Sequence, residues 1–194
     1  DRRQYEFAAN WKIPVENTIE SYHVPTVHPN TLVRFAAAGK ITHEIYERAA
    51  VMKSPIAAPA AYHRLANWLL PLLEPGCTHL YRLYHGLPNL FLIRIDAMLQ
   101  VMSVIPTSPE TCRMTVHVFI LRAARESWRS RLMTYWWGRF KTWIIRKVLS
   151  EDAPLYPDLH SGMKASPFLG TISTREELVW AFQDYVKKGL EPGA

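Results

Sequence analysis

The stretch that decides the fold of this chain runs from Asn10 to Pro29 and reads NWKIPVENTIESYHVPTVHP. Its two histidines, His23 and His28, are five residues apart, and Glu20 comes three residues before the first of them. Neutral imidazoles are common metal ligands, so two close histidines can contribute to a metal site. The pair alone is also compatible with a partly buried core histidine followed by a loop histidine, so the surrounding residues must decide between the two interpretations.

The local geometry allows both histidines to reach one point. We expect a short helix over residues 15–22, after a break at Pro14. A continuous helix would turn His28 about 140° away from His23, because the two are five residues apart. Pro25 removes this difficulty, since a proline disfavours helical geometry in the residue before it and so ends the helix. The chain can then curl back and offer His28 from a loop or a new turn.

The residues around the histidines resemble the iron-binding segment of the alpha subunits of Rieske-type ring-hydroxylating oxygenases. The agreement covers Asn-Trp-Lys at 10–12, Glu-Asn at 16–17, Glu-x-Tyr-His at 20–23 and the final His28. The resemblance implies a mononuclear Fe(II) site with His23 and His28 as ligands. Asn17 and Tyr22 then fall in positions that support the ligands, although Asn17 could also cap a turn and Tyr22 could simply pack.

A 2-His-1-carboxylate triad needs an acid as its third ligand, and no Asp follows the histidine pair until Asp96. Asp96 falls in IRIDAMLQ, an expected hairpin turn, and is a poor choice. The resemblance indicates Asp152, because the family's third ligand is the Asp of a Glu-Asp pair on a late helix. Glu151 is the rival ligand, and Asp158, in an expected turn, is a weaker one. A solvated charge at a helix end is the alternative interpretation of Asp152.

The chain carries only two cysteines, Cys77 and Cys112. With no extracellular marker, this favours free thiols in a reducing compartment, so we expect a cytoplasmic protein. Cys77-Thr78-His79 spells half of a Rieske ligand set. A Rieske [2Fe-2S] centre needs two Cys and two His, and the residue three positions after Cys112 is Thr115. We therefore expect no Rieske cluster in this chain.

The family's alpha subunits carry a Rieske domain before the iron domain. The resemblance covers most of the 194 residues, so residues 1–194 are expected to be a single catalytic domain, a fragment without the N-terminal Rieske domain. The cluster would lie on that missing domain or on a neighbouring subunit. The resemblance also implies a homotrimer, a reductase or ferredoxin as electron donor, and Glu20 as the catalytic carboxylate that links a cluster histidine to an iron ligand. The reaction would hydroxylate an aromatic or other small organic substrate with dioxygen.

Composition and charge fit a globular protein. Hydrophobic residues make up 48% of the chain and charged residues 21%, which are ordinary values, and no apolar run is long enough to span a membrane. The net charge of +6 arises mainly between Arg122 and Lys147. In that segment Trp136, Phe140 and Trp143 follow helical spacing, and we interpret them as a core stripe whose basic neighbours extend outward. We expect neither a nucleic-acid nor a membrane partner.

Strand patterns precede the long helical run. Strands are expected over residues 4–12, 40–52, 79–85, 90–95, 98–105 and 112–121, a short helix over 62–70 and a long one over 128–152. Strands first and helices later predict an α+β fold, an antiparallel sheet with helices on one face. The resemblance makes this a curved sheet of the helix-grip, START-like form, with the iron between sheet and helix.

Three other classes of protein remain open. A helix-grip domain could bind a hydrophobic ligand without redox activity, but such a carrier does not need His23, His28 and Asp152 together. A 2-oxoglutarate-dependent oxygenase usually has His-x-Asp followed by a distant His, whereas here two close histidines precede a distant Asp. Two histidines and a carboxylate also suit a zinc hydrolase, although no His-Glu-x-x-His motif is present.

Overall fold

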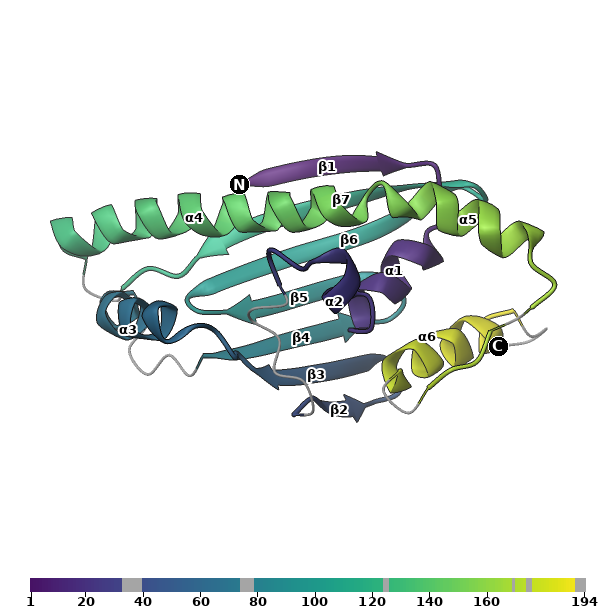
Figure 1. Ribbon diagram of the computed structural model, residues 1–194, viewed down its shortest axis with the longest axis horizontal. Coiled ribbons are helices and arrows are strands. Elements are labelled where there is room, and N and C mark those ends of the chain that lie inside the picture. The colour runs from purple at the N-terminus through teal and green to yellow at the C-terminus, as the bar shows by residue number, and fades with distance from the viewer. Residues whose placement is uncertain (33–39, 74–78, 124–125, 169, 174–175, 191–194) are drawn as a thin grey trace.

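A seven-stranded sheet with helices on one of its faces forms the body of the protein (Figure 1). The computed structural model describes residues 1–32, 40–73, 79–123, 126–168, 170–173 and 176–190. The strands are β1 (Arg2–Phe7), β2 (Thr42–Ile45), β3 (Ala49–Pro55), β4 (Leu80–Gly86), β5 (Leu90–Ile95), β6 (Met98–Ser108) and β7 (Thr111–Ile120). The helices are α1 (Lys12–Ile19), α2 (Val24–Val27), α3 (Ala60–Leu69), the 3₁₀ turn η1 (Leu70–Leu72), α4 (Trp128–Asp152), α5 (Leu155–Ala165) and α6 (Glu177–Lys188).

The sheet is antiparallel throughout, in the order β1-β7-β6-β5-β4-β3-β2. From β2 to β7 each strand pairs with the next one in the chain, and β1 adds to the free edge of β7. Alternate side chains of a strand point to opposite faces. On β6 this buries Met98, Gln100, Met102 and Val104, while the residues at 99, 101 and 103 are partly exposed. The alternation seen in the sequence therefore corresponds to a sheet that is buried on one face.

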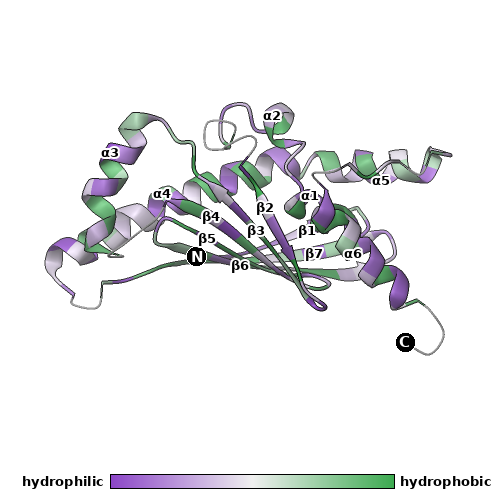
Figure 2. Ribbon diagram, turned by 90° about the horizontal axis from the view of Figure 1, so that it is seen from below, coloured by the Kyte–Doolittle hydropathy of each residue, from purple (hydrophilic) through white to green (hydrophobic). Residues whose placement is uncertain are grey.

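The helices gather on the buried face of the sheet. Figures 1 and 2 together show α1 and α2 over the central strands, while α4 runs along β7. The predicted α+β, helix-grip-like arrangement is thus confirmed. Within the described part of the chain, no helix is both long enough and apolar enough to cross a membrane.

The N-terminal elements differ from the expected boundaries. β1 is shorter than the strand expected over residues 4–12, and α1 begins before Pro14 rather than after it. A proline is tolerated in the first turn of a helix, where its missing N–H has no partner to lose. α1 also ends early, at Ile19, and Pro25 lies in the first turn of α2. The break expected between the two histidines is therefore wrong: the chain breaks before His23, and the residues between His23 and His28 form the one-turn helix α2.

The single strand expected over residues 40–52 is a hairpin made of β2 and β3. The N–H of Tyr46 donates to the carbonyl of Ala49 at 2.8 Å, and the chain bends at Glu47 and Arg48. This bend contains no Gly, Pro, Asn or Asp, so it lacks the residues that usually mark a turn in a sequence.

The core stripe expected on α4 is wrong. Trp136 and Trp143 are 61% and 56% exposed, whereas Trp137 is only 5% exposed. Adjacent helical residues differ by about 100° around the axis, so the true core face lies one position further along. The Nε1 of Trp137 donates to the backbone oxygen of Asp96 at 2.8 Å, and the Lys141 ammonium lies 4.9 Å from the Trp137 ring centroid.

Candidate metal centre

A one-turn helix brings His23 and His28 together on the helical side of the sheet. α1 ends at Ile19, and Glu20 follows in an extended conformation. His23 is then the N-cap of α2 and His28 its C-cap, with the N–H of His28 bonded to the carbonyl of Val24 at 3.0 Å. The two imidazole rings lie 5.2 Å apart between centroids, so both ends of one short helix present a ring to the same region.

Asp152, the last residue of α4, completes a cluster with the two histidines. Its Oδ1 lies 3.0 Å from the Nε2 of His28 and 3.8 Å from the Nε2 of His23. One ligand atom from each residue lies within 4.8 Å of the others, which is close enough to hold a metal ion. His28 and Asp152 are buried, and His23 is partly buried. The structure thus brings together the three residues that the sequence singled out.

The facing atoms of this cluster lie close together but form no hydrogen bond in the part of the protein that the structure describes. The Nε2 of His28 and the Oδ1 of Asp152 are buried, and neither has a hydrogen-bond partner among the described residues. A buried polar atom without a partner costs about 1–3 kcal/mol. Burial also raises the pKa of Asp152, an effect that His28 and His23 oppose only in part. Because a cation would satisfy these atoms and favour the carboxylate, the residues fit a divalent metal such as Fe(II) or Zn(II).

In each histidine of the cluster, the Nδ1 atom contacts a carboxylate. The Oε1 of Glu20 pairs with the Nδ1 of His23, and its Oε2 accepts the His23 backbone N–H at 3.3 Å. The Oε2 of Glu151 lies 2.7 Å from the Nδ1 of His28 and accepts the hydroxyl of Thr31 at 2.6 Å. Burial would raise the pKa of Glu151, but the bonds from Thr31 and His28 outweigh it and lower the pKa. Such pairs direct the other ring nitrogen toward a metal.

The two supporting positions predicted from the sequence have different surroundings. Asn17 lies beside the cluster, where its side chain hydrogen-bonds Asp152 and donates to the hydroxyl of Tyr156 at 3.3 Å. The hydroxyl of Tyr22 instead bonds Ser173, and Tyr22 is 48% exposed. Of the two, only Asn17 touches the ligand set.

Sequence reasoning did not find Thr31, Tyr156 or the contact between Glu151 and His28. The position of Glu151 next to Asp152 did indicate a role at the site. It suggested, however, that Glu151 binds the metal rather than that it hydrogen-bonds a metal ligand. Tyr156 is almost fully buried on α5, and burial raises its pKa. Nothing in the sequence marked Thr31, because its contact depends on how α2 and α4 pack.

Two other carboxylates considered as the third ligand, Asp96 and Asp158, lie apart from the cluster. Asp96 is in the turn between β5 and β6, where its carboxylate accepts hydrogen bonds from Tyr62 and, at 2.9 Å, from the ring of His79. It also lies 3.5 Å from the ammonium of Lys141. Asp158 is exposed on α5. Within the described ranges, the His23, His28 and Asp152 cluster is the one group of at least three such side chains that could hold a metal.

The half Rieske motif can be followed only in part. Cys77 lies outside the described residues. Both ring nitrogens of His79 have partners, Nδ1 with Asp96 and Nε2 with Asn67 at 2.6 Å. Cys112 is a free, buried thiol, and burial raises its pKa to about 11.

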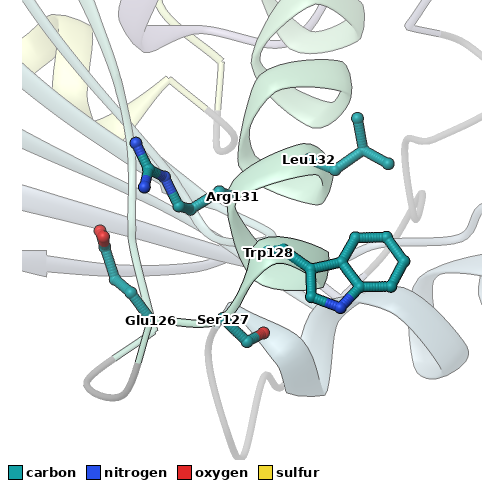
Figure 3. Close-up of a pocket in the computed structure, with 5 residues that line it drawn as sticks. All are labelled: Glu126, Ser127, Trp128, Arg131 and Leu132. Carbon is teal, nitrogen blue, oxygen red and sulfur yellow. The ribbon is translucent and has the colours of Figure 1, made fainter.

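A surface hollow lies at the other end of α4 from Asp152. The hollow has a volume of about 520 Å³. Among its lining residues, Figure 3 shows Glu126 and Arg131 on one side and Trp128 and Leu132 on the other. Ser127, the remaining lining residue, caps the first turn of α4 by accepting the N–H of Ser130. Because α4 has 25 residues and a helix rises 1.5 Å per residue, this hollow is remote from the triad.

Solved structures of Rieske monooxygenases share this fold. The quaternary ammonium monooxygenase CntA with an inhibitor is 17% identical with a TM-score of 0.67, covering 98% of this chain and 49% of its own. The NdmA variant of Pseudomonas putida CBB5 with theobromine is 12% identical with a TM-score of 0.61, at 96% and 49% coverage. Dicamba monooxygenase with 3,6-dichlorosalicylic acid is 12% identical with a TM-score of 0.63, at 97% and 58% coverage.

The chain thus spans about half the length of CntA and NdmA. No curated protein sequence matches it. The model of one protein family does match, over residues 1–191, and that family is described as the ring-hydroxylating alpha subunit, catalytic domain. A match over almost the entire chain, together with a His-His-Asp cluster on its helices, decides the relationship: the chain belongs to the family of ring-hydroxylating alpha-subunit catalytic domains.

Proposed function

We propose that this chain is the catalytic domain of a Rieske-type non-heme iron oxygenase, with His23, His28 and Asp152 as ligands of one Fe(II). The observation that carries the proposal is the cluster itself, in which two buried atoms, His28 Nε2 and Asp152 Oδ1, face one another without hydrogen-bond partners in the described structure. Two imidazoles and one carboxylate are the donor set of the facial triad. Family membership supports iron over zinc.

The residues of the chain have separate tasks in this proposal. Bound Fe(II) supplies the activation of dioxygen, because three protein ligands leave coordination positions open. His28 and Asp152 hold the buried side of the site, and His23 holds its more exposed side. Asn17 orients the Asp152 carboxylate through a hydrogen bond. The substrate class is an aromatic or other small organic molecule, and the product is hydroxylated.

Electron supply assigns a role to Glu20. In the proposal, a [2Fe-2S] Rieske cluster lies on another part of a longer protein or on a neighbouring subunit of a homotrimer, and a reductase or ferredoxin reduces it. Glu20 holds the Nδ1 of His23 and keeps 14% of its side chain exposed. A carboxylate in that place can accept a second imidazole N–H from outside and so join the two metal centres.

The alternative function is a hydrophobic-ligand carrier with the same fold. Such a carrier would keep the sheet and the helices, but it does not need two buried polar atoms that face each other without forming a hydrogen bond. A carrier also does not need the contacts of Glu20 with His23 and of Glu151 with His28. These contacts favour the metal-dependent function.

Iron retention tests the ligand assignment. His23→Ala, His28→Ala and Asp152→Ala should each lose iron while keeping the far-ultraviolet circular dichroism of the parent, because the sheet is built without the metal. The Asp158→Ala variant is the matched control, since Asp158 is an exposed acid on the neighbouring helix. Full iron occupancy in any of the three variants would remove that residue from the ligand set.

A second experiment tests Glu20. In the complete enzyme with its Rieske centre, Glu20→Gln should keep iron and substrate binding but slow turnover sharply. The amide fills similar space, carries no charge and cannot accept two N–H groups equally well. Turnover close to the parent value would show that Glu20 only orients His23 and has no part in electron transfer.

A further inference from the structure

Two consecutive residues of α4 hold opposite sides of one imidazole ring. Asp152 lies 3.0 Å from the Nε2 of His28, and Glu151 lies 2.7 Å from its Nδ1. We infer that Glu151 is a positioning residue, which anchors His28 to α4 and fixes its ring so that Nε2 faces the metal. This inference rests on the proposed iron site and adds a residue to it.

The hydrogen bonds around Glu151 define the orientation of the ring. Its Oε2 is bonded by the Nδ1 of His28 and by the hydroxyl of Thr31, at 2.7 and 2.6 Å. Thr31 is itself fixed, because it is 5% exposed and its backbone N–H donates to the carbonyl of His28 at 3.2 Å. An ionised carboxylate only accepts hydrogen bonds, so Nδ1 must carry the proton. In the neutral ring, which is the form that binds a metal, the lone pair of His28 is then on Nε2, on the side of Asp152.

The same contacts argue against Glu151 as a ligand. The carboxylate of Glu151 is on the Nδ1 side of the ring, whereas the ligand atoms gather on the Nε2 side with Asp152. Within the described residues, the metal-capable group contains His23, His28 and Asp152 and does not include Glu151. Two adjacent residues of α4 therefore have different tasks: Asp152 is a ligand, and Glu151 orients the ligand His28.

His23 and His28 differ in the carboxylate that contacts their Nδ1 atom. Glu20 belongs to the same segment as His23, three residues before it, so it stabilises the segment locally. Glu151 is 123 positions from His28 and ties α2 to the longest helix of the protein. His28 is fully buried, whereas the His23 side chain is 17% exposed. The site thus has an anchored ligand and a more accessible one, and Glu20 can engage an external group without loosening His28.

Metal affinity and the state of the His28 ring test this inference. The affinity of the metal-free chain for Co(II), followed by the absorption of the bound ion, should fall about 10–100-fold in Glu151→Ala, the usual effect of removing such a partner. Glu151→Gln should stay within about tenfold of the parent, because its amide oxygen still accepts the Nδ1 proton. Thr31→Val should lose about fivefold, the value of one hydrogen bond. Asp158→Ala is the control and should bind as the parent does.

Nitrogen-15 NMR of the histidine rings gives a readout that a merely structural role would not move. The metal-free parent and Glu151→Gln should show His28 protonated at Nδ1, and Glu151→Ala should lose that preference. An unchanged tautomer and affinity in Glu151→Ala would overturn the inference. A loss of Co(II) as complete as in Asp152→Ala, with the fold retained, would also overturn it and make Glu151 a ligand. If the parent chain itself bound no metal, the proposed function would fail instead.

Discussion

His85 is a buried histidine that the metal site does not use. It is fully buried on β4, its ring stacks on Phe91 with centroids 4.5 Å apart, and its Nε2 bonds the carbonyl of Pro88 at 2.9 Å. Its Nδ1 has no hydrogen-bond partner among the residues the structure describes. Burial lowers the pKa of His85 to about 4, and the bond to Pro88 opposes this only in part. The folded protein therefore holds this ring neutral at pH values where the unfolded chain protonates it.

This pKa predicts how stability depends on pH. Between the unfolded pKa of 6.5 and the folded pKa of about 4, the unfolded state binds the extra proton, so the free energy of unfolding falls as the pH falls. The contribution of His85 is about 1.4 kcal/mol per pH unit across this window. His85→Phe keeps an aromatic ring against Phe91 and removes the titration. Denaturant unfolding at pH 7 and pH 4.5 should show a smaller pH dependence in this variant, and an equal dependence would contradict the pKa.

Helix α4 carries tryptophans on different faces, and only one of these faces belongs to the core. Trp137 packs in the second core cluster with Ala66 and Leu70 of the α3 region, and its indole N–H bonds the turn at Asp96. Trp136, the preceding residue, is exposed. The same helix thus anchors α3 through its first half and provides Asp152 at its end.

Two neighbouring substitutions separate these faces. Trp137→Ala should lower the free energy of unfolding by about 3–5 kcal/mol, because it leaves a cavity in the core and removes the hydrogen bond to the backbone oxygen of Asp96. Trp136→Ala should change it by less than about 0.5 kcal/mol, the usual range for a surface position. Equilibrium unfolding in urea measures both. Equal losses in the two variants would mean that the core face of α4 is not the one seen here.

The elements show what the sequence could and could not predict. β5 to β7 were predictable, because alternation and the turn residues Pro88-Asn89 and Asp96-Ala97 act locally. The β2–β3 bend was missed because Glu47 and Arg48 carry no turn signal. The face of α4 was misassigned because Trp136 and Trp137 are equally hydrophobic, and only the packing of α3 and the Asp96 turn distinguishes them.

On the scale of the whole molecule, the cluster joins two parts of the chain that are far apart in the sequence. His23 and His28 come from the first helices, and Asp152 from the end of α4. The sequence predicted this cluster only through its resemblance to a known family. No local pattern links positions that are so far apart. The contact between Glu151 and His28 was beyond the sequence, because it depends on which side of the ring faces α4.

Metal binding should consequently stabilise the fold without being required for it. The main core lies between the sheet and the helices, with residues such as Leu83, Phe91 and Phe182 fully buried away from any ligand role. Fe(II) at 100 times its dissociation constant adds about 2.7 kcal/mol, which corresponds to a rise in Tm of about 5–10 °C for a protein of this size. Anaerobic thermal unfolding with Fe(II) and with a chelator measures this shift. Complete unfolding by the chelator at room temperature would contradict the prediction.

The most direct test of the central claim is to add nitric oxide to the anaerobic chain after loading with Fe(II). Three protein ligands leave positions open, so the parent should give a high-spin iron–nitrosyl EPR signal of about one spin per chain, and the signal should disappear in His28→Ala and in Asp152→Ala. A parent chain that retains iron but gives no nitrosyl signal, or variants whose signal equals that of the parent, would contradict an open Fe(II) site on His23, His28 and Asp152.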